Sequence, residues 1–248
     1  MTHHPTGPVL PTPYEIDAVA TLWPALSESG KAAMVGRLPS APCGVTLTEQ
    51  SRSADAYGRN IRGSVRALWG GVIDLDQFLS TMQLAVRRGL TLAWREGAAE
   101  CGIKPDELTE VEIKALEMAI RSESVYIFDF GEYIEANSKA TGGLLRSLMN
   151  RVGLWINRYL DVTNRAKVMA CKDQKLEWVI NYVRGVKENC DSCLRLNGQV
   201  RRGSAWQRAG VRPQSPPNAK LACRGWKCGC GLVPTDKPVS RGKLPSLP

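Results

Sequence analysis

The sequence predicts a mainly α-helical body followed by a small α+β module that depends on cysteine for its stability. Three observations lead to this fold class. Capped amphipathic segments run along the first part of the chain, short aromatic and turn-rich segments replace them near residue 175, and cysteines cluster after residue 190. The expected divisions are an extended arm over 1–14, the helical body over 15–175, the module over 176–236 and a flexible tail over 237–248.

The composition is that of a soluble globular protein. The 248 residues are 43% hydrophobic and 23% charged, which is enough apolar material for a sizeable core. Residues 1–13 contain no Lys or Arg and are broken by prolines, unlike a secretory signal. No run approaches the roughly 18 apolar residues of a membrane-spanning helix. We therefore expect a soluble protein of a reducing compartment with no membrane partner.

Two helices are expected in the first hundred residues. The earlier one lies around Ile16 to Leu38. The later one should run from about Leu75 to Glu100, because Asp74 can cap its first free amides and Gln77 stands at the reciprocal position of a capping box. Its apolar residues recur at steps of three and four, which places them on one face of the helix.

Two further helices follow. Thr109 and Glu112 repeat the capping-box pattern, so a helix should begin after Thr109 and extend towards Glu135. Another should begin after the break at Gly142–Gly143 and continue to about Cys171. The residues expected on its apolar face are Leu144, Leu148, Val152, Trp155, Tyr159, Val162 and Ala166.

The texture of the chain changes after Asp173. The run from Trp178 to Val183 is short, aromatic and β-branched, which favours a strand. Beyond it the chain is interrupted by glycines and prolines so often that a conventional core is not expected. Something else must therefore order this segment.

Five of the eight cysteines could order this segment by binding a metal ion. They form a C-x-x-C pair and a second group about 30 residues later: Cys190, Cys193, Cys223, Cys228 and Cys230. This is the layout of a structural zinc site, so one Zn²⁺ per chain is expected and the module is zinc-stapled. Disulfides would require an oxidising compartment, and a redox C-x-x-C would leave three cysteines unexplained. Five candidates compete for four positions, so the ligand set stays open.

The other three cysteines are isolated in the sequence. They are Cys43, Cys101 and Cys171, and each is expected to be a small buried side chain with no chemistry of its own.

Positive charge is confined to the end of the chain. From residue 184 onwards there are 13 Lys or Arg and three acids, a net charge of +10, whereas residues 1–183 carry −1. We therefore expect the module to face a polyanion, above all double-stranded DNA without sequence preference, or an acidic protein surface. The side chains expected to contact phosphates are Arg201, Arg202, Arg208, Arg212, Arg224 and Lys227.

Three tryptophans lie in or beside the module, namely Trp178, Trp206 and Trp226. They could stack on bases beside the arginines, or they could form a small apolar core over the metal. The second use is favoured because a metal-held module needs apolar cover.

Residues that would indicate catalysis are few. His3 and His4 are the only histidines, and both precede the helical body, which argues against a histidine-based triad. The spacing of Asp129, Glu132 and Glu135 is typical of a solvated helix face rather than of a paired-acid site. Ligation by four thiolates would leave a zinc ion no open position for hydrolysis. The chain is therefore expected not to be an enzyme.

The C-terminal cysteine-rich segments resemble the head morphogenesis, or minor head, proteins of bacteriophages of the Mu F type. The matching segments are Cys190–Val200, Pro216–Pro217 and Cys228–Pro234, and the stretches Asn157–Tyr159 and Asn164–Ala166 resemble the helix that precedes them in that family. Many members carry a histidine shortly before the C-x-C. Here Gly225 occupies that region, and Cys223 can replace the histidine as a ligand. Roughly the first 140 residues match no motif.

The resemblance implies a component of the virion or procapsid interior, present in the host cytoplasm during assembly. Its implied partners are the portal protein, the major capsid protein and packaged DNA. A zinc-ribbon nucleic-acid-binding protein of cellular origin is the alternative, and an enzyme with its active site in the first 140 residues is a third reading.

Overall fold

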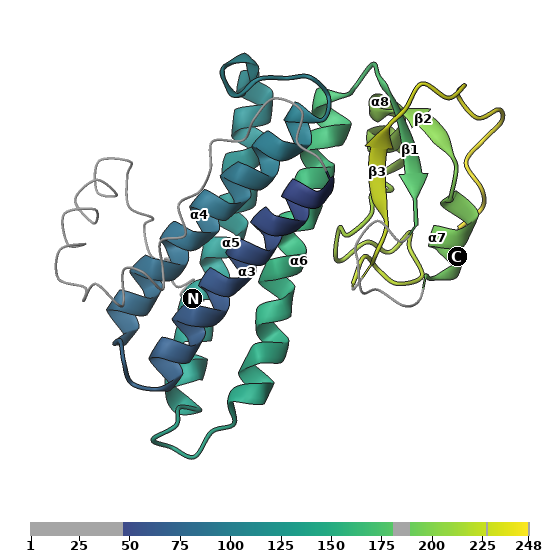
Figure 1. Ribbon diagram of the computed structural model, residues 1–248. Coiled ribbons are helices and arrows are strands. Elements are labelled where there is room, and N and C mark those ends of the chain that lie inside the picture. Colours follow the sequence, from purple (N-terminus) through teal and green to yellow (C-terminus); the bar gives the residue numbers. More distant parts are fainter. Residues whose placement is uncertain (1–46, 181–188, 227, 248) are drawn as a thin grey trace, which may run out of the picture. The chain divides into compact units, whose positions relative to one another are not determined.

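The computed structural model describes residues 47–180, 189–226 and 228–247 (Figure 1). These parts of the chain are mainly helical, with one small sheet. In chain order the elements are α3 (Leu47–Trp69), α4 (Leu75–Ala99), the 3₁₀ turn η2 (Pro105–Glu107), α5 (Glu110–Ala136), α6 (Leu145–Ala170), β1 (Lys175–Val179), α7 (Asp191–Leu196), β2 (Val200–Arg202), α8 (Gly203–Ala209) and β3 (Gly231–Pro234). The expected arm over 1–14 and the helix over 16–38 lie outside the described residues.

The helices α3, α4, α5 and α6 pack together as a bundle in which consecutive helices run antiparallel (Figure 1). Short connections between them favour this arrangement, since each helix can pack against its neighbour in the chain. The largest fully buried side chains of the bundle are Ile61, Phe78, Met82, Leu90, Trp94, Ile127, Ile134, Leu148 and Tyr159. Burial of this apolar surface is what stabilises the bundle.

The predicted capping boxes are confirmed. The Asp74 carboxylate accepts the backbone N–H of Gln77 at 2.8 Å, and the Gln77 side chain accepts the N–H of Asp74 at 3.2 Å. Thr109 and Glu112 form the same reciprocal pair at the start of α5. Both helices therefore begin at the residues that follow the predicted caps.

The helix predicted after Gly142–Gly143 is α6. A Cβ at Gly143 would lie 2.0 Å from the carbonyl oxygen of Asn137, so glycine is required for the close approach of the two chain segments. The predicted apolar face is buried except at Leu144, which precedes the helix as its N-cap residue and is 75% exposed. The prediction that Leu144 belongs to the apolar face of this helix is therefore wrong.

A second core lies around the three-stranded antiparallel sheet, whose strand order is β2-β1-β3. The strand predicted from Trp178 begins earlier, at Lys175, and residues 181–183 of the prediction are not described. Trp178 and Trp206 are fully buried with ring centroids 5.6 Å apart, as expected of a small apolar core. Trp226 differs, because 39% of it is exposed.

Helix α6 connects the bundle to this second core. The Lys167 ammonium is fully buried, forms an ion pair with Glu100 at 2.8 Å and donates to the carbonyl of Leu232 in β3 at 3.0 Å. Cys101 and Cys171 form a disulfide beside it. The prediction that each of these two cysteines has no chemistry of its own is therefore wrong, although both are buried as expected. The third isolated cysteine, Cys43, lies outside the described residues.

The segment expected to be a flexible tail is bound along β2. The backbone of Val200 donates to the Ser240 hydroxyl at 2.9 Å, and the Ser240 N–H donates to the carbonyl of Val200 at 3.0 Å. Arg195 also donates to the carbonyl of Ser246 at 2.9 Å. These bonds hold residues 240–246 on the module, so the tail is an integral part of it.

The bundle also buries a carboxyl group, Glu96 on α4, which is 2% exposed and accepts a hydrogen bond from the Tyr159 hydroxyl at 2.7 Å. Burial raises its pKa to about 7, because desolvation penalises the charged form and hydrogen bonds from Ser53 and Tyr159 offset only part of that penalty. In the unfolded chain the group ionises near pH 4.5. Between these two values the folded state alone holds the proton, so stability falls as the pH rises through this window.

We predict that Glu96→Gln removes this pH dependence. The amide keeps an acceptor for Tyr159 without a charge, so the variant should be more stable than the wild-type chain at pH 8, by on the order of 1–3 kcal/mol. Urea unfolding measured from pH 5 to 8 tests it, with Glu117→Gln on the exposed surface of α5 as control. A Glu96→Gln profile parallel to that of the wild-type chain would contradict the prediction.

Candidate metal centre

The first two thiols of the centre come from the start of α7. Cys190 is the N-cap residue of the helix and Cys193 lies in its first turn, so the three-residue spacing places both side chains on one face. Their Sγ atoms are 3.4 Å apart. Cys193 is 1% exposed and Cys190 is half-buried, so the pair faces the interior of the module.

The other three thiols come from the segment that leads into β3. The Sγ atom of Cys228 lies 3.6 Å from that of Cys193, and Cys230 is fully buried. This segment is fastened to α7 by the backbone N–H of Ala222, which donates to the hydroxyl of Ser192 at 2.9 Å. Next to this bond, the Sγ atom of Cys223 lies within 4.8 Å of those of Cys190 and Cys193.

The five thiols form two overlapping triads. One contains Cys190, Cys193 and Cys223, the other Cys193, Cys228 and Cys230, and within each triad the sulfur atoms lie within 4.8 Å of one another. Around a zinc ion with Zn–S bonds of about 2.3 Å, tetrahedral ligands are separated by roughly 3.8 Å. The separations Cys190–Cys193 and Cys193–Cys228, 3.4 and 3.6 Å, are close to that value. The cluster could therefore hold a metal ion, and Cys193 belongs to both triads.

Hydrogen bonds between the thiols change how readily each of them ionises. Hydrogen bonds donated by Cys193, Cys223 and Cys230 hold the pKa of Cys228 far below its usual range. The pKa of Cys193 is raised, because its proton is shared with Cys223, Cys228 and Cys230. The pKa of Cys190 is lowered as well, because desolvation by burial is outweighed by hydrogen bonds from Cys193 and Cys223. Several thiolates at this distance would repel one another. A divalent cation removes that repulsion.

A tight loop makes room for Cys223. Arg224 and Gly225 both have left-handed backbone conformations, with φ of 50° and 79°. A Cβ at Gly225 would lie 2.8 Å from the backbone nitrogen of Pro216, so only glycine fits against the Pro216–Pro217 segment. No side chain at position 225 could act as a ligand, and Cys223 supplies the sulfur in this part of the loop.

A chain of buried amides connects the centre to α6. The Gln214 amide donates to the carbonyl of Cys228 at 2.9 Å and accepts from Asn164 at 3.0 Å, and the Asn164 carbonyl oxygen accepts the N–H of Leu232 at 3.2 Å. Such contacts around a metal site fix the ligand backbone. Gln214 was not predicted as part of the site, and its pairing with a residue 50 positions away leaves no local signal in the sequence.

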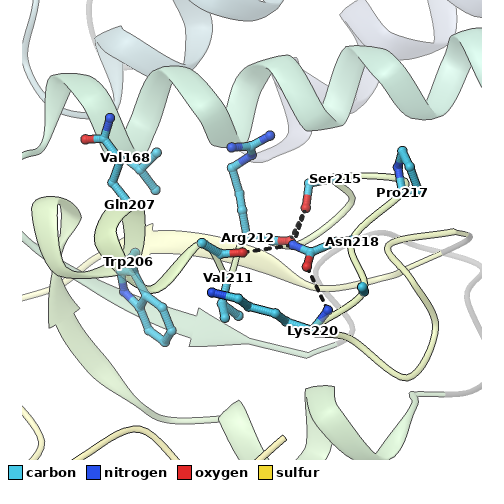
Figure 2. A pocket seen from close by; sticks show the side chains of 11 residues that line it. Val168, Trp206, Gln207, Val211, Arg212, Ser215, Pro217, Asn218 and Lys220 are labelled. Carbon is cyan, nitrogen blue, oxygen red and sulfur yellow. Dashed lines mark hydrogen bonds between the residues drawn. The ribbon is translucent and has the colours of Figure 1, made fainter. Parts of the chain in front are cut away.

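A shallow pocket of about 400 Å³ lies beside this loop, between α6, α8 and residues 211–220 (Figure 2). The Asn218 side chain, which lines the pocket, is used within the loop. Asn218 donates to the carbonyl of Gly210 at 3.1 Å and to the Ser215 hydroxyl at 3.0 Å, and it accepts the backbone N–H of Lys220 at 3.1 Å. The pocket therefore follows from how the loop folds.

The basic residues expected to contact phosphates separate into two groups. Arg201 is 7% exposed, and its guanidinium donates to Gln199 and to the backbone carbonyls of Ser240 and Gly242, so it binds the C-terminal segment instead of a phosphate. Arg212 pairs with Asp161 on α6 at 2.7 Å. Three of the predicted arginines are exposed, namely Arg202, Arg208 and Arg224, while Lys227 lies outside the described residues.

Sulfur ligation and the surrounding residues are typical of a structural metal site. Four thiolates would close the coordination sphere of zinc. The carboxylates Asp129, Glu132 and Glu135 lie elsewhere, on α5, and are exposed, as predicted for a solvated helix face.

Within residues 47–180, 189–226 and 228–247, no helix combines the length and apolar character needed to cross a bilayer. Comparisons with protein-family models, curated proteins and solved structures find no match.

Proposed function

We propose that the protein is a non-enzymatic bacteriophage minor head protein, in which the bundle docks on the portal or capsid and a zinc-stapled basic module faces packaged DNA. The observation that carries the proposal is the convergence of the segments that resemble the Mu F-type family. Cys190–Val200 forms α7 and the start of β2, and Cys228–Pro234 leads into β3 and completes the sheet beside the cysteine cluster.

The helix that precedes these segments supports the same proposal. Arg158 forms ion pairs with Glu123 at 2.6 Å and Asp161 at 2.8 Å, and Asp161 in turn binds Arg212 of the module. Asn164 binds the loop and β3. The stretches around Arg158 and Asn164 that resemble the family thus join the bundle to the module. Such contacts suit a structural protein without a catalytic role.

A cellular zinc-ribbon protein that binds nucleic acid is the second candidate. It is favoured by Trp226, which is 39% exposed and lies two residues from the exposed Arg224, because an aromatic ring beside an arginine suits a single-stranded base and its phosphate. Location distinguishes the two candidates, since a nucleic-acid-binding protein of the cell has no reason to join a viral particle.

The minor head proposal predicts that the protein co-sediments with procapsids or mature heads when it is expressed with the structural genes of its phage. Mass spectrometry of gradient-purified particles measures it. A parallel preparation without the portal gene is the control for trapping of free protein, and signal in the particle fraction should fall there if the portal is the docking partner. Absence from every head-related particle would contradict the proposal and favour the cellular candidate.

A further inference from the structure

One arginine between the bundle and the module has no partner. Arg165 on α6 is half-buried, and within the described part of the chain its guanidinium takes part in no hydrogen bond, ion pair or ring contact. Burial lowers the pKa of Arg165, and the nearby charge of Arg212 lowers it further. A desolvated charge without a partner is costly, so it calls for an anion from outside the chain.

The carboxylates around Arg165 are already used. Arg212 donates to one oxygen of Asp161 through Nε at 3.1 Å and through Nη2 at 2.7 Å, and Arg158 donates to the other oxygen at 2.8 Å. Glu123 on α5 pairs with Arg158 at 2.6 Å. Three guanidinium groups therefore share two carboxylates, which leaves an excess of one positive charge.

The module contains no acid that could neutralise this excess. Residues 192–235 carry eight Lys or Arg and no Asp or Glu. The loop over residues 211–220, which borders this part of α6, adds Lys220 to Arg212. The missing negative charge therefore has to come from a ligand.

The pocket of Figure 2 gives a ligand access to this corner. Asp161, Arg165 and Val168 follow one another at steps of four and three residues, so they share one face of α6. Val168 lines the pocket, and so does Arg212, whose side chain reaches from the loop to α6 (Figure 2). The volume of about 400 Å³ is sufficient for a small anion, and the residues that line it include Lys220 and no acid.

The donors that remain in this corner suit a phosphate group. All three guanidinium nitrogens of Arg165 lack an acceptor in the described part of the chain, and Arg212 has Nη1 left after Nε and Nη2 bind Asp161. Two guanidinium groups can donate to several oxygens of a tetrahedral phosphate at once, whereas a carboxylate offers two oxygens. A phosphate carries about one negative charge as a diester and up to about two when free, which offsets the excess.

We propose that Arg165 and Arg212, at the edge of the pocket between α6 and residues 211–220, bind a phosphate group. Two sources share this chemistry, the phosphodiester of a nucleic acid and a free phosphate or phosphomonoester. The site differs from the exposed arginines of the module, because it combines groups from the bundle and from the loop. The inference does not rest on the proposed function, since it concerns only the charges at this junction.

Titration of the full-length, zinc-loaded chain with inorganic phosphate tests the proposal, with chloride at the same ionic strength as reference. Isothermal titration calorimetry should show saturable binding, and phosphate should raise the Tm, as a ligand of the folded state does. Arg165→Gln should weaken phosphate binding on the order of tenfold or more. Without phosphate the Tm of this variant should equal or exceed that of the wild-type chain, because an unpaired charge beside Arg212 is removed.

Two further variants separate a binding role from a structural one. Arg146→Gln removes the same charge from an exposed position in the first turn of α6 and should leave phosphate binding unchanged. Arg165→Lys keeps the charge without the planar set of donors and should recover only part of the affinity. If Arg165 only supported the fold, Arg165→Gln would lower the Tm equally with and without phosphate.

Duplex DNA distinguishes the two sources of phosphate. A site for a nucleic-acid phosphodiester predicts that Arg165→Gln also weakens DNA binding and makes the slope of log affinity against log salt shallower by about 0.9. Phosphate binding with unchanged DNA affinity assigns the site to a free phosphate or phosphomonoester. A wild-type chain that responds to phosphate and chloride alike, or a phosphate affinity that Arg165→Gln leaves intact, would overturn the proposal.

Discussion

Replacement of Cys193 by serine is expected to abolish metal binding and to unfold the cysteine module while the helical bundle stays folded. Cys193 belongs to both thiol triads and is 1% exposed. Its replacement therefore removes the one sulfur atom that the two triads share. A structural zinc site contributes on the order of 10 kcal/mol to the folding of such a module. Zinc content should fall from about one ion per chain to almost none.

Two measurements made together check this expectation. Elemental analysis gives the zinc content, and near-ultraviolet circular dichroism reports on the packed pair Trp178 and Trp206, whose signal should disappear. The far-ultraviolet signal of the bundle helices should largely remain. Cys43→Ser is the control, because Cys43 lies outside the cysteine cluster of the sequence, which begins at Cys190. A zinc-free protein with an ordered module, or a native disulfide between Cys190 and Cys193, would contradict the prediction.

Individual serine variants of the remaining cysteines decide which four sulfurs bind the ion. Three of these four variants should lose zinc as Cys193→Ser does, and the fourth should keep it, because five thiols are present for four tetrahedral positions. The variant that keeps its zinc identifies the cysteine outside the coordination sphere. The four positions concerned are Cys190, Cys223, Cys228 and Cys230.

Helices α4, α5 and α6 could be predicted because their signals are local. The capping boxes at Asp74 and Thr109 lie within three residues of the helix starts that they determine. Helix α3 was missed, although its buried residues Tyr57, Ile61 and Val65 recur at steps of four. The mean hydropathy of this segment is low, and Gly58 and Gly63 interrupt it. Its apolar stripe is therefore too narrow for periodicity alone to predict a helix.

The metal centre could be predicted by residue type because cysteine is chemically distinctive, whereas its surroundings could not. Cys101 and Cys171 are 70 residues apart, and Asn164 is 50 residues from Gln214, so no spacing in the sequence relates them. The total charge of the module was read correctly as basic. The sequence did not show which arginines are exposed and without structural contacts, because the buried contacts of Arg201 with backbone carbonyls depend on where the C-terminal segment lies.

These contacts change how DNA binding should be tested. Arg201→Glu would place a carboxylate among the carbonyls of Ser240 and Gly242, and the module would be disturbed whether or not it binds DNA. Arg212→Glu would break the ion pair with Asp161 in the same way. The exposed arginines Arg202, Arg208 and Arg224 carry no such structural contact to a carboxylate in the described part of the chain. Substitution of these three arginines therefore changes the surface charge without breaking such a contact.

The full-length chain with zinc should bind duplex DNA of any sequence, and the triple variant Arg202→Glu, Arg208→Glu, Arg224→Glu should bind it on the order of 100-fold more weakly. Each phosphate contact that is lost removes about 0.9 from the slope of log affinity against log salt, so the slope should become shallower by up to roughly 3. Fluorescence anisotropy measures both the affinity and its salt slope, at salt concentrations from about 50 to about 300 mM, where phosphate contacts dominate binding. Arg87→Glu with Arg88→Glu, on the exposed surface of α4, changes the net charge without touching the module and should have a much smaller effect. If the wild-type chain shows no affinity at low salt, the basic surface is better explained as a contact for an acidic protein, because the net charge of +10 from residue 184 onwards favours a partner of opposite charge.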